Sequence, residues 1–285
     1  MKTLSYAHLQ SQEKLGASAK TIALIFADDD VNLHHTITHA MGLGFQRIFI
    51  FGNPELTPDL DDDRLIWVTT DILTNDAVIA IVNTYIGLFP NTWIHYCFNA
   101  EYLYFPFCDT RGIGDFVGFL DEEKRLSAFA STIDLYPESI TNTDQDFAPQ
   151  HAHLDRIGYY SHARRDEFGP LPRQLDVFGG LRWRFEEHIP WERRRINNAS
   201  VFKASEGLKL GQNFTFNIPE YETVQCEWHN SPTTCVCSFR AAKYLLNNPE
   251  SRAQIRSFSW PNSIEFDQSA KQLLELGMME PGQWF

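Results

Sequence analysis

Continuous apolar runs of strand length alternate with amphipathic segments of helical length through the first hundred residues. The apolar runs occupy 21–27, 47–51, 65–68 and the stretch that starts at 93, with helical spacing of apolar residues over 31–43 and 72–87. Uninterrupted apolar strands are typical of parallel sheets, because helices cover both faces of such sheets. The first two runs and the helix between them have the length of a βαβ unit. The pattern therefore predicts an α/β fold with a mixed, mostly parallel, Rossmann-like sheet flanked by helices.

The remainder of the chain is less regular. Its pattern predicts a helix over 115–124, a strand over 129–136, an exposed loop over 138–150, a glycine turn into a short strand over 178–185, short strands over 208–216, and helices over 233–246 and 268–276. Residues 1–20 are polar and mixed, which predicts a short helix before the first strand. Because no repeat or low-complexity linker is present, we expect a single domain over 1–285 with an irregular C-terminal half.

Polar residues follow two of the apolar runs. Three Asp residues, at 28–30, end the first run, and an Asn-Ala-Glu sequence at 99–101 interrupts the fourth. Both places are candidate sites, since ligands of open α/β sheets bind beyond the carboxyl ends of the strands. In the alternative interpretation the Asp residues favour a helix N-terminus. Glu101 would then be a solvated carboxylate next to a turn made by Asn99.

Arginines gather within 182–195 of an otherwise acidic chain. Arg182 and Arg184 follow a Gly-Gly turn, and planar guanidinium groups pair well with phosphates. The alternative is an exposed strand in which these arginines pair with Glu186, Glu187 and Glu192. We favour the phosphate-binding role for Arg182 and Arg184 and make no such assignment for the arginines at 193–195.

Charge and composition disfavour several classes of function. The net charge of −13 repels nucleic acids and anionic membrane surfaces, so we expect neither as a partner. The N-terminal sequence has no apolar signal-peptide core, and no window of about 18 apolar residues exists, so we expect a cytoplasmic protein without a membrane span. The commonest dinucleotide, NTPase and hydrolase motifs of α/β proteins, G-x-G-x-x-G, the P-loop and G-x-S-x-G, are all absent from the sequence.

The five cysteines include no C-x2-C pair. The nearest approach to a zinc site is Cys235 and Cys237, in a helix-like segment, together with Cys226 and His229. Small buried hydrophobic residues are the more usual state of such cysteines in this context.

Several segments, taken in order, resemble the bacterial family 2-type glycosyltransferases of GT-A fold whose sugar-nucleotide site carries a D-A-D-E-F-L-type strand end. The similar segments are the opening βαβ with LGFQRIFIFGN at 43–53, the strand at 93–106, IDLYP at 133–137, GGLRWR at 179–184, KLGQNFTF at 209–216 and SFRAAK at 238–243. The resemblance spans about 20–246. It implies a GT-A fold with a nucleotide-binding half over about 20–136 and an acceptor-side and C-terminal half over about 150–285.

The resemblance implies transfer of a sugar from a nucleotide-diphosphate donor to a glycan or another hydroxyl acceptor. In that family paired acids hold Mn²⁺ or Mg²⁺, which neutralises the diphosphate. The residues it implies for nucleotide-sugar binding here are Ala27, Asp28, Asp29, Asn53, Asn99, Ala100, Arg182 and Arg184. The acidic motif is degenerate, because Phe98, Asn99 and Ala100 stand where D-A-D is expected. Only Asn99 and Glu101 are left as cation ligands, a weak set for a hard cation.

Two functional hypotheses follow from the degenerate acidic motif. In the first, the chain is a glycosyltransferase with little or no metal dependence, in which Arg182 and Arg184 replace the cation as an electrostatic clamp. Glu101 and Asp134 are then the candidate general bases, Glu101 ahead because it lies at the strand end. In the second, the chain is a non-catalytic nucleotide- or glycan-binding module, or an assembly partner, that keeps the fold.

Overall fold

The computed structural model describes residues 1–10, 18–70, 74–140 and 147–285. The chain forms two compact units. Unit 1 consists of Met1–Asn99, Thr110–Ala128 and Ala199–Glu222, and unit 2 consists of Ala100–Asp109, Phe129–Asn198 and Thr223–Phe285. The architecture is mixed α/β, with a large, mostly parallel sheet flanked by helices. At this level the fold class predicted from the sequence is confirmed.

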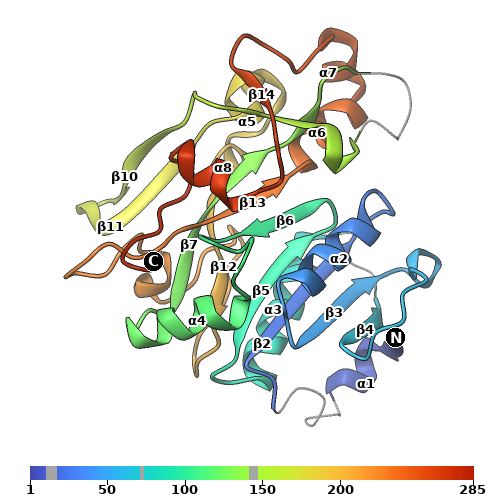
Figure 1. Cartoon of the computed structure of the whole chain (residues 1–285), viewed down its shortest axis with the longest axis vertical. Coiled ribbons are helices and arrows are strands. Elements are labelled where there is room, and N and C mark those ends of the chain that lie inside the picture. Colours follow the sequence, from blue (N-terminus) through green and yellow to red (C-terminus); the bar gives the residue numbers. More distant parts are fainter. Residues whose placement is uncertain (11–17, 71–73, 141–146) are drawn as a thin grey trace. The chain divides into compact units, whose positions relative to one another are not determined.

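Unit 1 is built on five parallel strands in the order β1-β4-β3-β2-β5, and the antiparallel β12 lies beside β5 (Figure 1). Its strands are β1 (Lys2–Ser5), β2 (Thr21–Ala27), β3 (Arg47–Gly52), β4 (Leu65–Thr69), β5 (Trp93–Phe98) and β12 (Asn197–Lys203, from Ala199 onward). Its helices are α1 (Tyr6–Gln10), α2 (Leu33–Gly42), α3 (Asn75–Leu88) and α4 (Ile113–Glu122), with 3-10 turns at Pro54–Leu56 and Pro219–Glu222. The strand order reverses at β2, because β3 and β4 lie on one side of it and β5 on the other.

Helix α3 packs on one face of this sheet. Alternate residues of β2, among them Leu24 and Phe26, lie in one buried cluster with Tyr85 and other apolar residues of α3. The Tyr85 ring meets the Phe49 ring edge-to-face, with centroids 4.9 Å apart. The helix begins after Thr74, whose hydroxyl accepts a hydrogen bond from the Ala77 N–H at 3.2 Å. The start expected near residue 72 lies outside the described residues.

Helices α2 and α4 have one buried face each. The buried side of α2 contains Leu33, Ile37 and Ala40, and that of α4 is formed by Ile113, Phe116, Val117 and Leu120. The Ile113 N–H donates to the Leu43 carbonyl, 2.8 Å away, which joins the start of α4 to the end of α2. Sequence periodicity thus located both helices to within two residues at each end, the usual precision of helix boundaries.

Unit 2 contains shorter strands. Its strands are β6 (Glu101–Tyr104), β7 (Ser127–Asp134, from Phe129 onward), β8 (Tyr136–Pro137), β9 (Ala152–Asp155), β10 (Tyr160–Asp166), β11 (Gly169–Phe178), β13 (Thr234–Ser238) and β14 (Ser263–Glu265). Its helices are α5 (Leu181–Arg184), α6 (Arg240–Asn247), α7 (Pro249–Gln254) and α8 (Ala270–Glu275), with 3-10 turns at Pro149–His151, Glu186–His188 and Trp191–Arg193. Strand β13 pairs parallel with β7 and antiparallel with β6, whereas β10 and β11 form a hairpin. None of the helices among the described residues has the length and hydrophobicity that crossing a membrane requires.

Several local predictions for the irregular parts are wrong. The helix expected over 233–246 is strand β13 followed by α6, because Thr234–Ser238 is buried on both sides and rich in β-branched and small apolar residues. The strand expected over 178–185 is the short helix α5, which begins after Gly180 in a left-handed conformation with φ 63°. Of the strands expected over 208–216, a single bridge between Leu210 and Phe216 forms. Strand β1 lies where only a helix was expected.

His95 is a buried titratable group at the centre of the unit 1 sheet. It is 2% exposed, its Nδ1 lies 3.0 Å from the Ser200 carbonyl oxygen, and its ring stacks on Phe45 at 5.8 Å. Burial lowers the pKa of His95 to about 4, the hydrogen bond to Ser200 partly opposes this shift, and His39 adds to it. His95 is therefore neutral in the folded protein at neutral pH.

We expect the substitution His95→Gln to weaken the acid sensitivity of the fold. Between the ordinary pKa of 6.5 and the folded value of about 4, the unfolded chain binds a proton that the folded chain does not. The stability contributed by neutral His95 is therefore complete above pH 6.5 and is lost as the pH falls towards 4, by about 2 kcal/mol at pH 4.5. Urea unfolding at pH 7.0 and at pH 4.5 measures how far the free energy of unfolding falls between these pH values. We expect this fall to be about 2 kcal/mol smaller in His95→Gln than in the parent. His34→Gln, at an exposed position of α2, is the control, and an unchanged difference in His95→Gln would contradict the assignment.

Candidate functional site

The carboxyl ends of β2 and β5 carry the candidate site of unit 1. These strands are neighbours, paired in parallel from Thr21 and Trp93 to Phe26 and Phe98. The strand order reverses at this pair, because β3 lies on the side of β2 away from β5. Such a topological switch point opens a crevice where open α/β sheets bind ligands. Asp28 follows β2 and Asn99 follows β5.

Asn99 fixes the turn after β2. Its side chain is fully buried, and its amide oxygen accepts a hydrogen bond from the Asp28 N–H at 3.2 Å. The amide nitrogen donates to Asp29 Oδ1 at 2.6 Å and to the Val31 carbonyl at 3.0 Å. One side chain thus satisfies three polar groups of a single turn. A buried amide that is so fully bonded holds its partners in one geometry.

The turn is closed by two further features. Asp29 Oδ1 also accepts a hydrogen bond from the Val31 N–H at 3.0 Å, and Asn32 adopts the left-handed conformation, φ 57°, immediately before α2. Asn tolerates this conformation better than most residues. Asp28 is exposed while Asp29 is half-buried. The arrangement therefore presents Asp28 to solvent at the end of β2 and uses Asp29 to hold the turn.

Apolar side chains lie beneath this turn, and a second Asn lies on the next strand. The Phe26 ring stacks on Phe51 at 5.2 Å and lies 5.8 Å from the half-buried Phe98. Ala27, at the end of β2, is buried. Asn53, after β3, accepts a hydrogen bond from the Glu55 N–H at 3.1 Å and caps a 3-10 turn. The side-chain oxygen of Asn53 therefore has a structural partner.

In unit 2, Glu101 begins β6 next to a backbone position of unusual conformation. Its Oε1 accepts a hydrogen bond from the Ser238 hydroxyl at 3.0 Å, and its side chain is half-buried. The preceding Ala100 is fully buried with φ 61°, and its carbonyl accepts from the Phe239 N–H. A left-handed alanine costs roughly 1–2 kcal/mol. Such a position persists only where surrounding contacts determine it.

Asp134 and Arg182 form a buried ion pair in unit 2. Arg182 Nε donates to Asp134 Oδ1 at 3.2 Å and its backbone N–H donates to Oδ2 at 3.3 Å. Asp134 is 1% exposed. Burial raises the pKa of Asp134, while Arg182 opposes the shift. A Cβ on Gly180 would lie 2.8 Å from Asp134 Oδ2, so glycine is required there both by this approach and by its positive φ.

Arg184 is held in a second ion pair, with Asp155. Nε and Nη2 of Arg184 lie 2.7 and 3.1 Å from the two carboxylate oxygens, and Nη2 also donates to the Phe258 carbonyl at 2.8 Å. Asp155 additionally accepts hydrogen bonds from the Tyr136 hydroxyl and, at 2.7 Å, from Trp260 Nε1. The guanidinium lies over the Tyr136 and Trp260 rings, 5.5 and 5.2 Å from their centroids.

Sequence reasoning missed Asp155, Tyr136 and Trp260 as members of this network. Asp155 ends β9, whose burial pattern gives no periodic signal for a charged residue, and Trp260 lies more than a hundred positions away. One signal could have indicated such a network. A guanidinium in mostly apolar surroundings needs a carboxylate partner, so Arg184 predicted an acidic residue close to it in the fold.

The structure thus distributes the expected site residues between the two units. Asp28, Asp29 and Asn99 come together in one hydrogen-bonded turn of unit 1, with Ala27 and Asn53 at the ends of the neighbouring strands. Ala100, Glu101, Asp134, Arg182 and Arg184 belong to unit 2. Within unit 2 the described hydrogen bonds join Asp134 to Arg182 and place Glu101 with Ser238.

The remaining ligands do not fit a divalent cation of the kind that the family resemblance implies. The Asn99 amide oxygen is directed at the Asp28 N–H, and its NH₂ group faces the Asp29 carboxylate. The Glu101 carboxylate accepts a hydrogen bond from Ser238. Mg²⁺ and Mn²⁺ take several oxygen ligands, and the one oxygen of the Asn99 amide is already engaged by a backbone N–H.

Comparisons with known proteins give no family assignment, since no protein-family model and no curated protein matches the chain.

Replacing the amide of Asn99 by a carboxylate, Asn99→Asp, should make stability fall with rising pH. The new, buried carboxylate would face the half-buried Asp29 at the distance now spanned by a 2.6 Å hydrogen bond, and two carboxylates so close share a proton. Because such a pair has a folded pKa above the unfolded value, its penalty is absent at low pH and grows as the pH rises through that folded value. Urea unfolding at pH 5 and 8 should show a loss of about 3 kcal/mol or more at the higher pH relative to the parent.

Asn53→Asp is the matched control, because an Asp caps the Pro54–Leu56 turn as well as Asn does. Equal pH dependence in the two variants would refute the assigned role of the Asn99 amide.

Removing the guanidinium of Arg184 by Arg184→Met should lower the free energy of unfolding by about 3–5 kcal/mol, because it leaves the buried Asp155 without its cation. Chemical denaturation measures this loss. Arg165→Met, at an exposed position of β10, should change stability by less than about 0.5 kcal/mol. A small effect of Arg184→Met would show that the Asp155 network does not hold unit 2 together.

Proposed function

We propose that unit 1 binds the nucleotide part of a nucleotide-diphosphate sugar at the carboxyl ends of β2 and β5, and that the chain is a glycosyltransferase of GT-A type. The observation that carries this proposal is the Asn99-fixed turn at the point where the strand order reverses. A crevice there is the general ligand position of open α/β sheets. The order of sequence segments similar to family 2-type glycosyltransferases supports the choice of ligand.

Within this proposal the turn supplies two kinds of contact. The exposed Asp28 carboxylate accepts hydrogen bonds from a base or a ribose, and the ordered backbone around Ala27 and Asp28 fixes its position. The half-buried Phe98, which packs on the buried Phe26, provides an apolar ring at the end of β5. Because Asn99 already holds Asp28 and Asp29 in place, little conformational entropy is lost on binding.

The proposed reaction proceeds without a bound cation. The role of Mn²⁺ in the similar family is neutralisation of the diphosphate, and the Asn99 amide is oriented as a donor to Asp29 rather than as a cation ligand. Glu101 is the proposed general base that takes the proton of the acceptor hydroxyl, because it is half-buried at the start of β6. Asp134 is the weaker candidate, since its carboxylate is buried against Arg182.

A specific observation favours a second candidate function, a non-catalytic nucleotide- or glycan-binding module. Arg182 and Arg184, the expected diphosphate clamp, are paired with the buried Asp134 and Asp155. To reach a diphosphate, either guanidinium must break a buried ion pair, which is costly. A protein that keeps the nucleotide crevice while its arginines stabilise the fold would bind donors without turnover.

Nucleotide binding is tested by thermal unfolding of the full chain with uridine and guanosine diphosphates and their sugars, each with EDTA or with Mn²⁺. We expect stabilisation by at least one of these ligands, undiminished by EDTA, corresponding to about 2.7 kcal/mol at 100 times the dissociation constant. Asp28→Ala, an exposed change that leaves the Asn99 bonds to Asp29 and Val31 in place, should abolish the shift without changing the ligand-free midpoint by more than a degree or two. Asp30→Ala is the matched control, and absence of any nucleotide-dependent shift would rule out the proposal.

Catalysis is tested by release of nucleoside diphosphate from the stabilising nucleotide sugar. Glu101→Gln should reduce turnover by about 10²–10⁴-fold and leave the ligand-induced shift unchanged, because a general base acts on the reaction rather than on binding. Glu138→Gln, at an exposed position of unit 2, is the control. Complete inhibition by EDTA would contradict the metal-independent mechanism. Stabilisation by nucleotide sugars without turnover would favour the binding module.

A further inference from the structure

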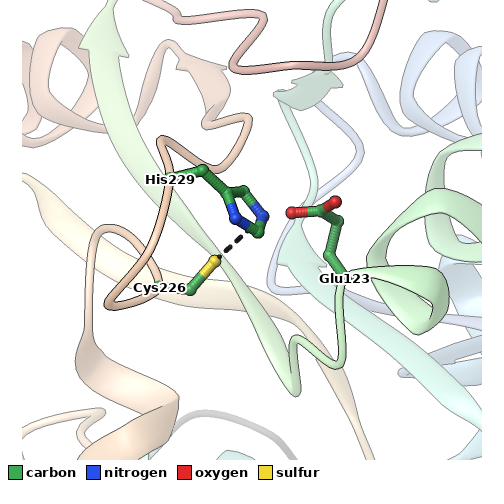
Figure 2. A group of neighbouring side chains, drawn as sticks. All are labelled: Glu123, Cys226 and His229. Carbon is green, nitrogen blue, oxygen red and sulfur yellow. Dashed lines mark hydrogen bonds between the residues drawn. The ribbon is translucent and has the colours of Figure 1, made fainter.

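Cys226 and His229 form a side-chain pair in unit 2 outside the candidate site. Cys226 Sγ lies 3.2 Å from His229 Nε2 and 3.4 Å from the Ser231 hydroxyl oxygen. Figure 2 shows the imidazole ring directed at the thiol; the third side chain drawn there, Glu123, belongs to unit 1. A nucleophile and a base within about 3.2 Å satisfy the geometric requirement for activation of a thiol by an imidazole.

The loop that carries this pair is held in shape by its own hydrogen bonds. The Cys226 N–H donates to the Ser231 hydroxyl oxygen at 3.2 Å, so Ser231 contacts both the backbone and the thiol of Cys226. Ser231 is buried, whereas Cys226 and His229 are half-buried and Trp228 between them is 82% exposed. The thiol is thus fixed next to the imidazole, on a loop whose neighbouring Trp228 is exposed.

The other four cysteines lack this setting. Cys97, Cys235 and Cys237 are buried in strands β5 and β13. Cys108 is half-buried, and burial raises its pKa to about 12. Burial likewise raises the pKa of Cys235 and Cys237. Thiols in apolar surroundings are inert because the reactive species is the thiolate.

We propose that Cys226 is an oxidant-reactive thiol of this chain, with His229 as its base and a hydroperoxide, such as hydrogen peroxide, as the substrate class. The sulfur attacks one peroxide oxygen, an S–O bond forms and the O–O bond breaks. His229 Nε2 takes the thiol proton and passes it to the departing hydroxide or alkoxide, which leaves as water or alcohol. Sulfur is oxidised to the sulfenic acid and the peroxide is reduced, so no other reactant is needed.

A small oxidant suits this position better than a large substrate does. The pair lies on a half-exposed loop rather than at a strand end, and the transfer needs only the thiol and the imidazole at 3.2 Å. The sulfenic acid so formed is reversible by thiols. The site is chemically independent of the proposed nucleotide crevice in unit 1, and Cys226→Ser should leave nucleotide binding unchanged.

The experiment is oxidation of the folded full-length chain with hydrogen peroxide in the presence of dimedone, followed by mass-spectrometric quantification of the label on each cysteine peptide. We expect labelling at Cys226 to be at least about tenfold faster than at Cys108, the other half-buried thiol of the same molecule. His229→Gln should slow labelling of Cys226 by about 100-fold and leave Cys108 unchanged, because the base is lost. His151→Gln, at an exposed position of unit 2, should change neither rate.

Equal labelling of Cys226 and Cys108 in the parent protein overturns the proposal, and so does an unchanged rate at Cys226 in a folded His229→Gln variant. Should His229→Gln fail to fold, as judged by its thermal unfolding, the comparison within the parent chain decides. Labelling by iodoacetamide at neutral pH provides a second measurement with the same expected order of rates.

Discussion

The hydrogen bond from the Asn99 amide to Asp29 is the interaction on which the candidate site of unit 1 depends. It is 2.6 Å long, involves a charged acceptor and originates from a fully buried side chain. Charge-assisted bonds of this kind are about twice as strong as neutral ones. The same amide holds the Asp28 N–H and the Val31 carbonyl, so the turn after β2 is bound to the end of β5. The polar groups at the end of β2 are therefore held in place by hydrogen bonds within the chain.

The strands of unit 1 could be predicted from the sequence because their signal is local. Thr21–Ala27 and Trp93–Phe98 are buried, apolar and bounded by polar residues, and the structure has strands there. The prediction of a helix over 233–246 was wrong because the signal there is not local. The strand Thr234–Ser238 is specified by pairing with β6 and β7, which lie over a hundred positions away, and a short apolar run by itself does not distinguish helix from strand. Strand β10 of the β10–β11 hairpin is largely exposed and gave no hydrophobic pattern.

The same contrast between local and long-range signals applies to the residues of the candidate site. The ends of β2 and β5 follow from strand positions and from the geometry of parallel sheets, so the proximity of Asp28 to Asn99 could be anticipated. The partners of the arginines could not. Arg184 finds Asp155, 29 positions before it, and the Phe258 carbonyl, 74 positions after it, while Asp155 also binds Trp260, 105 positions away. A guanidinium in sequence has the same appearance whether it faces a phosphate or a buried carboxylate, and only the fold decides between them.

An amide rather than an acid at position 99 has a consequence for the electrostatics of this turn. Two acids at the ends of adjacent strands repel one another and require a shared cation or proton. With an amide donor in one of the two positions, the Asp29 carboxylate is hydrogen-bonded by its neighbour, and neither is required. The Asp28 and Val31 N–H groups are likewise bonded within the turn, to Asn99 and Asp29, so the polar groups of the turn satisfy one another. The affinity of the nucleotide site proposed for unit 1 depends on how rigidly the polar groups of this turn are held. The Asn99 amide provides that rigidity.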